Sequence, residues 1–69
     1  MNWTRVSQIK GHDADLWFGK DSEGYSRYTV TSRHAQTGMT VEPTACDGAN
    51  TPMAAIDTYL ADRDKAGGK

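Results

Sequence analysis

The chain has few of the residues that build disulfide or metal sites, and it has no long apolar run. Its 69 residues include one cysteine, Cys46, and two histidines. One cysteine excludes an internal disulfide and a multi-cysteine zinc site, so we expect a free thiol in a reducing compartment. No stretch approaches the roughly 20 apolar residues that span a bilayer. We therefore expect a cytoplasmic protein without membrane contact.

A surplus of charge is also missing. Eight Lys and Arg residues oppose nine Asp and Glu residues, which gives a net charge of −1, so no overall field attracts nucleic acid or an acidic membrane. Hydrophobic residues make up only 36%, yet large ones occur throughout the chain, unlike in a disordered tail. We expect one small domain over residues 1–66 and a frayed tail over 67–69. Its thin core would gain stability from a partner or a second copy.

The spacing of the apolar residues changes at Pro52. Before it, short alternating runs separated by glycine-containing turns predict strands within 2–9, 16–18, 25–33 and 39–42. After it, helical spacing predicts a helix with an apolar face of Met53, Ile56 and Leu60, flanked by Tyr59. The expected fold is α+β: an antiparallel sheet of three to four strands with one C-terminal helix packed on one face.

Local signals support these boundaries. Asp21-Ser22-Glu23-Gly24 is typical of a hairpin turn with Gly24 in a left-handed conformation, and Pro43 cannot continue the last strand. Thr51-Pro52 supplies an N-cap hydroxyl and a proline at the first helical position. The pair Gly67-Gly68 predicts the end of the helix.

The sequence gives little support for catalysis or for cofactor binding. His12, Asp13 and Asp15 are residue types that bind metals, but all three belong to one predicted turn, and neighbouring residues seldom point at one ion. Nothing brings Cys46 close to a histidine base. A domain of this size also has little room for an enclosed substrate pocket. We expect no metal, no cofactor and no enzyme activity.

The first functional hypothesis is protein binding. In size and character the chain resembles the small accessory proteins of phages and mobile elements, such as anti-CRISPR inhibitors. This resemblance implies that it inhibits or modulates a host protein complex. Trp17 would be the apolar anchor, because tryptophan is enriched in interfaces. The turns at the two ends of the second strand would mimic phosphates toward a basic or nucleic-acid-binding partner, through Asp13, Asp15, Asp21 and Glu23.

The alternative is a nucleic-acid-binding module. Arg27, Thr29, Thr31 and Arg33 form the polar row of one strand, and Arg5 could join them on an open sheet face. Together with Trp17, the turn at Thr37-Gly38 and the helix after Pro52, this strand resembles the amino-terminal DNA-binding domains of phage-type integrases. The resemblance implies DNA binding through Arg5, Arg27 and Arg33, although the chain lacks the basic character of those domains. A homodimer that pairs exposed edge strands is the third hypothesis.

Overall fold

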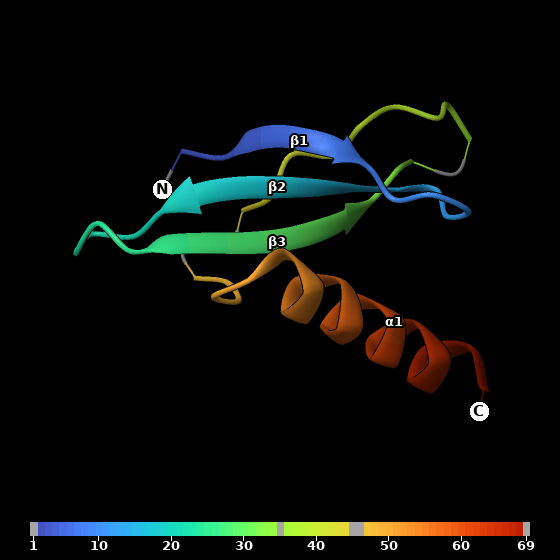
Figure 1. Ribbon diagram of the computed structural model, residues 1–69. Coiled ribbons are helices and arrows are strands. Elements are labelled where there is room, and N and C mark those ends of the chain that lie inside the picture. Colours follow the sequence, from blue (N-terminus) through green and yellow to red (C-terminus); the bar gives the residue numbers. More distant parts are fainter. Residues whose placement is uncertain (1, 35, 45–46, 69) are drawn as a thin grey trace.

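The computed structural model describes residues 2–34, 36–44 and 47–68. Three strands, β1 (Thr4–Gln8), β2 (Ala14–Lys20) and β3 (Ser26–Ser32), precede one helix, α1 (Pro52–Gly68). The strands form an antiparallel sheet in the order β1-β2-β3, with α1 beside β3 (Figure 1). The predicted α+β class is therefore confirmed, with three strands in the sheet. Cys46, the predicted free thiol, lies outside the described residues.

The predicted turns are present. Gly24 has a φ of 87°, and its N–H donates to the Asp21 carbonyl at 3.0 Å, which closes the hairpin between β2 and β3. Gly38, with a φ of 69°, donates to the carbonyl of His34 at 2.7 Å. These are left-handed conformations that favour glycine. β3 pairs evenly with β2 along its whole length, whereas β1 has a bulge between Arg5 and Ser7.

The strand predicted over 39–42 was wrong. This segment has no regular structure and crosses the sheet on the side away from α1, where it passes behind the strands in Figure 1. Its contacts are single ones: Met39 O accepts from His34 N at 2.8 Å, and Val41 O accepts from the Thr31 hydroxyl at 2.6 Å. A segment with strand-forming residues still needs a neighbouring backbone ladder. Residues 39–42 lie across a face of the sheet, where the strands have no free backbone groups with which to pair.

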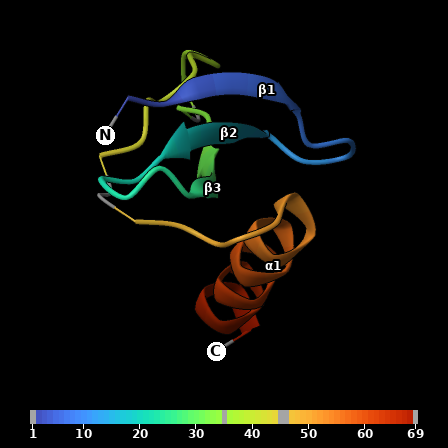
Figure 2. The ribbon, with the colours of Figure 1, turned by 60° about the vertical axis from the view of Figure 1, so that its left-hand side comes forward.

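The core between the sheet and α1 is small. Ile9, Ala14 and Leu16 are buried against Ala55, and Val30, Ile56 and Tyr59 are among the half-buried residues packed around them. The helix begins as predicted, because the Thr51 hydroxyl accepts from the Ala54 N–H at 3.1 Å. Figure 2 shows α1 below the sheet, at the end of the segment that leads away from the strands.

The predicted apolar face of the helix needs a correction. Met53 is 73% exposed, and Ala55 takes the buried position instead. The reason is the placement of α1, which packs mainly against β3 and only slightly against β2. The residues that meet the sheet are then Ala55, Ile56 and Tyr59. The helix also extends through Gly68, past the end that the glycine pair predicted.

The face of the sheet opposite α1 is covered as well. Trp3 and Trp17 are only 8% and 7% exposed. The Trp17 ring Nε1–H donates to the Thr31 hydroxyl at 2.8 Å, and that hydroxyl in turn donates to Val41 in the crossing segment. A Cβ placed on Gly48 would lie 3.2 Å from the Trp3 ring. The crossing segment therefore acts as a thin second layer, and the expected open sheet face is not present.

Within the residues that the structure describes, no helix combines the length and the apolar character needed to traverse a lipid bilayer.

Candidate binding site

The four carboxylates expected to form an acidic surface are not gathered into one. Asp15 is completely buried and accepts hydrogen bonds from Arg5 Nε at 3.0 Å and from Arg33 Nε and Nη2 at 3.2 and 3.1 Å. The bond from Arg33, supported by Arg5, holds the pKa of this carboxyl below its ordinary value, against the opposing effect of desolvation. Asp15 thus joins the three strands and is not accessible to a partner, contrary to the expectation.

The other three carboxylates divide between two distant turns. Asp13 is exposed before β2, while Glu23 is exposed and Asp21 mostly covered after it. A strand of seven residues separates the two turns by about 23 Å. Asp21 is also occupied: it accepts from the N–H groups of Glu23 and Tyr25, each at 2.9 Å, and the bond from Tyr25 is the main cause of its lowered pKa. A single phosphate-mimicking surface is not formed.

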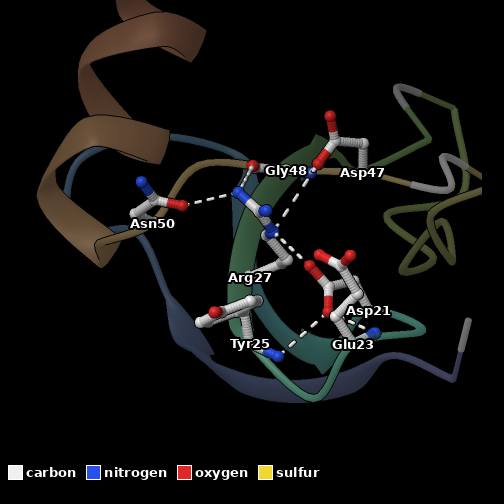
Figure 3. Close-up of polar contacts among 7 residues, drawn as sticks. All are labelled: Asp21, Glu23, Tyr25, Arg27, Asp47, Gly48 and Asn50. Atoms are coloured by element: carbon white, nitrogen blue, oxygen red, sulfur yellow. Dashed lines mark hydrogen bonds and ion pairs between the residues drawn. The ribbon is translucent and has the colours of Figure 1, made fainter.

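Arg27 has an intramolecular role (Figure 3). Its Nε lies 3.0 Å from Asp21 Oδ2 and 3.7 Å from Asp47 Oδ1. Its Nη1 donates to Asn50 Oδ1 at 2.5 Å and more weakly to Gly48 O at 3.4 Å. Arg27 therefore joins the hairpin turn to the segment that leads into α1. Arg5 and Arg33 pair with Asp15, and Arg27 pairs with Asp21. All three arginines expected to bind DNA therefore have carboxylate partners within the chain.

Trp17 does not reach the surface. Its ring is buried under the crossing segment, so an anchor role would require that segment to open. Among the residues that the structure describes, the exposed large apolar side chains are others: Val6, Tyr25, Met39, Val41 and Met53. The burial of Trp17 could not be predicted from the sequence. Alternation along β2 shows that Trp17 and Leu16 face opposite sides of the sheet, but it does not show which segments of the chain cover each side.

The outer edge of β3 is the most distinctive binding feature. Tyr28 exchanges two backbone hydrogen bonds with Ala49, both 2.8 Å, so its N–H and C=O point away from β2. In an antiparallel pair this orientation repeats at every second residue, so the N–H and C=O groups of Val30 and Ser32 also point outward. The described part of the chain gives these two residues no backbone partner on that side.

A groove of about 380 Å³ lies directly beside this edge. Its walls are β3, the segment 47–49 and one side of α1. Small residues, Ala49, Ala55 and Thr58, line it together with the Tyr59 ring. Asp47 and Asp62 bring carboxylates to it, and the side chain of Asp47 is 84% exposed. The arrangement offers main-chain hydrogen bonds, a shallow apolar floor and negative charge.

Residue types for metal chemistry do not converge: over residues 2–34, 36–44 and 47–68, no three His, Cys, Asp or Glu side chains are placed to hold one ion. Comparisons of the chain with protein-family models, with curated proteins and with solved structures found no match. The functional argument therefore depends on the geometry of the chain itself.

Proposed function

We propose that the chain is a non-catalytic protein-binding module that takes up an extended segment of a partner protein along the outer edge of β3. The observation that carries the proposal is the run of outward-facing main-chain groups on this edge, at Val30, which lines the groove, and at Ser32, which follows it along the strand. An added strand would complete these hydrogen bonds, and its alternate side chains would enter the groove. Covering a segment of a host complex in this way is how the module would inhibit or modulate that complex.

The two edges of the sheet differ, and the difference favours β3. β1 is interrupted by the bulge between Arg5 and Ser7, which breaks the regular spacing of its outward groups. Bulges of this kind protect edge strands from pairing with other chains. β3 is regular throughout and has the groove beside it. A partner segment would therefore extend the sheet from β3.

The charge of the groove indicates the chemistry of the segment. Asp62 is exposed, and Asp47 accepts a hydrogen bond from the Gly48 N–H at 2.7 Å while the nearest cation paired with it among the described residues, Arg27 Nε, is 3.7 Å away. A lysine or arginine in the added strand would place a positive charge near both carboxylates. The small residues Ala49 and Ala55 leave room for the aliphatic stem of such a side chain. We therefore expect a basic, strand-forming segment. The expected partner is still basic, but the carboxylates that would face it are Asp47 and Asp62.

Selection from a library of random displayed heptapeptides would test the proposal, followed by affinity measurements on the enriched peptides. The decisive variant is Ser32→Pro, with Ser32→Ala as its matched control. Proline removes an N–H that makes no bond to β2, so the sheet keeps its internal ladder. Alanine retains the N–H and loses only the hydroxyl contact to Tyr59 at 3.2 Å.

We expect enrichment of peptides with lysine or arginine among strand-forming residues. Ser32→Pro should weaken their binding about tenfold, because a hydrogen bond is lost and the ring obstructs the edge, while Ser32→Ala stays within about twofold. Asp62→Asn should weaken binding and reduce its salt dependence, which tests the groove even if the proline variant does not fold. The proposal would be refuted if Ser32→Pro, Ser32→Ala and Asp62→Asn all bound the peptides with the affinity of the wild type. A concentration-dependent dimer that Ser32→Pro abolishes would also refute it, since the edge would then belong to a second copy.

A further inference from the structure

Asp47 and Gly48 form the only Asp-Gly pair in the sequence, which contains no Asn-Gly pair. In such a pair the main-chain nitrogen of glycine can attack the side-chain carboxyl of the residue before it, because no Cβ shields that nitrogen. The product is a cyclic succinimide, which water opens to aspartate or to isoaspartate. In a folded protein the reaction depends on the exposure of the carboxyl group and on the position of the nitrogen.

Both conditions are met at Asp47 (Figure 3). Its side chain is 84% exposed, and the ion pair to Arg27 Nε is long, at 3.7 Å. The Gly48 N–H donates to Asp47 Oδ1 at 2.7 Å, so the nitrogen already lies beside the carboxyl group that it would attack. A reacting pair held in this way needs little further search for the productive orientation.

Asp21-Ser22 is an internal comparison with the opposite geometry. Asp21 Oδ1 accepts from the N–H groups of Glu23 and Tyr25, and Oδ2 pairs with Arg27. Both oxygens are therefore engaged by groups other than the Ser22 nitrogen, and the Cβ of Ser22 hinders an attack by that nitrogen.

The fold requires glycine at the reactive position. A Cβ on Gly48 would lie 2.5 Å from the Tyr28 carbonyl oxygen, so a larger residue would displace the backbone. The next residue, Ala49, exchanges two hydrogen bonds of 2.8 Å with Tyr28. The close approach at this end of the β3 edge thus depends on the residue type that makes the preceding aspartate reactive.

We propose that Asp47 is a site of spontaneous isomerisation to isoaspartate. The Gly48 nitrogen forms a bond to Cγ of Asp47, and the carboxyl hydroxyl leaves with the amide proton as water. One water then opens either C–N bond of the imide. Opening the bond to Cγ restores aspartate, whereas opening the bond to the main-chain carbonyl carbon gives isoaspartate. The sequence of steps needs no oxidant, metal or enzyme.

Isomerisation would alter a wall of the groove beside β3, which the segment 47–49 forms. In isoaspartate the main chain gains one carbon before Gly48, which displaces Ala49 from its pairing with Tyr28. The free carboxylate is then attached directly to the main chain and reaches less far into the groove. Weaker binding of a basic segment is the consequence, and that consequence alone rests on the proposed function.

Incubation of the folded protein at pH 6 in water enriched in the heavy oxygen isotope tests the proposal, because each passage through the succinimide transfers one oxygen from water to the residue. Mass spectrometry of proteolytic peptides follows the label and the isoaspartate. We expect both to accumulate at Asp47 at least about tenfold faster than at Asp21. Asp47→Glu is the matched control: it keeps the charge, and its longer side chain forms a cyclic imide far more slowly.

A parallel incubation in urea separates the effect of the geometry from that of the sequence. Labelling of Asp47 in the folded protein should stay within about tenfold of the rate in the unfolded chain, since the fold exposes the carboxyl and holds the nitrogen beside it. The proposal fails if Asp47 is labelled no faster than Asp21, or if folding slows its labelling by more than about tenfold.

The purified isoaspartyl form should exchange the amide hydrogens of Tyr28 and Ala49 faster than the unmodified protein, because their pairing is displaced. It should also bind the enriched basic peptides about threefold more weakly. If the unmodified protein binds no peptide, the proposal for the β3 edge fails, while the isotope and hydrogen-exchange results still decide whether Asp47 isomerises.

Discussion

Replacing Asp15 with asparagine removes one negative charge from the centre of the sheet and almost no volume. The carboxylate is fully buried in β2 and receives three hydrogen bonds from two guanidinium groups, one in β1 and one just after β3. Asparagine keeps one acceptor oxygen, but its amide would face a guanidinium with N–H groups. We expect the folded state to lose stability although the shape of the core is preserved.

The size of the loss follows from the three bonds. A hydrogen bond to a charged group contributes roughly 1 kcal/mol more than a neutral one, which suggests about 3 kcal/mol for the set. The side chains of Arg5 and Arg33 are 46% and 24% exposed, so water can solvate them after the substitution. We therefore expect about 2 kcal/mol. A chain of this length is stable by about 3–10 kcal/mol, and the melting temperature should fall by about 10 °C.

The same reasoning predicts a pH dependence. Because the pKa of Asp15 in the folded state is below its ordinary value of 3.8, the unfolded chain binds its proton first as the pH falls. Stability from this group is therefore fully present above about pH 5 and is lost as the pH drops through the lowered pKa. Thermal unfolding at pH 6 and pH 3 should show a large difference between the wild type and Asp15→Asn at pH 6 and a smaller one at pH 3.

Asp13→Asn is the matched control, since the same change is made two residues away on an exposed side chain. It should alter the unfolding free energy by less than about 0.5 kcal/mol. Two results would refute the reasoning. One is an equal melting temperature for the two variants at pH 6. The other is a difference between the wild type and Asp15→Asn that stays constant down to pH 3.

Three further substitutions test the packing. Gly48→Ala should destabilise the fold strongly, because the new Cβ would lie 2.5 Å from the Tyr28 carbonyl oxygen; chemical denaturation should show an earlier midpoint, and an unchanged midpoint would contradict the close approach. Trp17→Ala should cost about 3–5 kcal/mol as a buried aromatic, with loss of the near-ultraviolet circular dichroism signal, whereas a surface anchor would leave that signal and the stability intact. Met53→Ser should change the melting temperature by no more than about 2 °C, since Met53 is 73% exposed; a large loss would restore the helix face expected from the sequence.

The order of the elements could be predicted from sequence because each had a local cause. The alternation from Tyr25 to Arg33, the glycine at the hairpin and the cap at Thr51 act over a few residues. The strand predicted over 39–42 failed because strand formation requires a neighbouring ladder, and this was not available to a segment that crosses a face.

The candidate site was harder to predict, because it depends on contacts between distant residues. Asp15 can be buried because Arg5 reaches it from β1 and Arg33 from just beyond the end of β3, and the sequence does not give the register that brings them together. Likewise, the outer edge of β3 is defined by the strand order and by the pairing of Tyr28 with Ala49, which are 21 positions apart. No short-range pattern contains this information.

The crossing segment beside Trp17 consists of chain without helix or strand. Such a layer opens more readily than a hydrogen-bonded element, since few backbone bonds must break. Local opening of residues 39–44 would therefore admit water and a collisional quencher to the Trp17 ring, while the contacts of Ala55 and Tyr59 on the other side remain closed. The two faces of one thin sheet would then respond to solvent on separate timescales, and intrinsic fluorescence would follow the faster one.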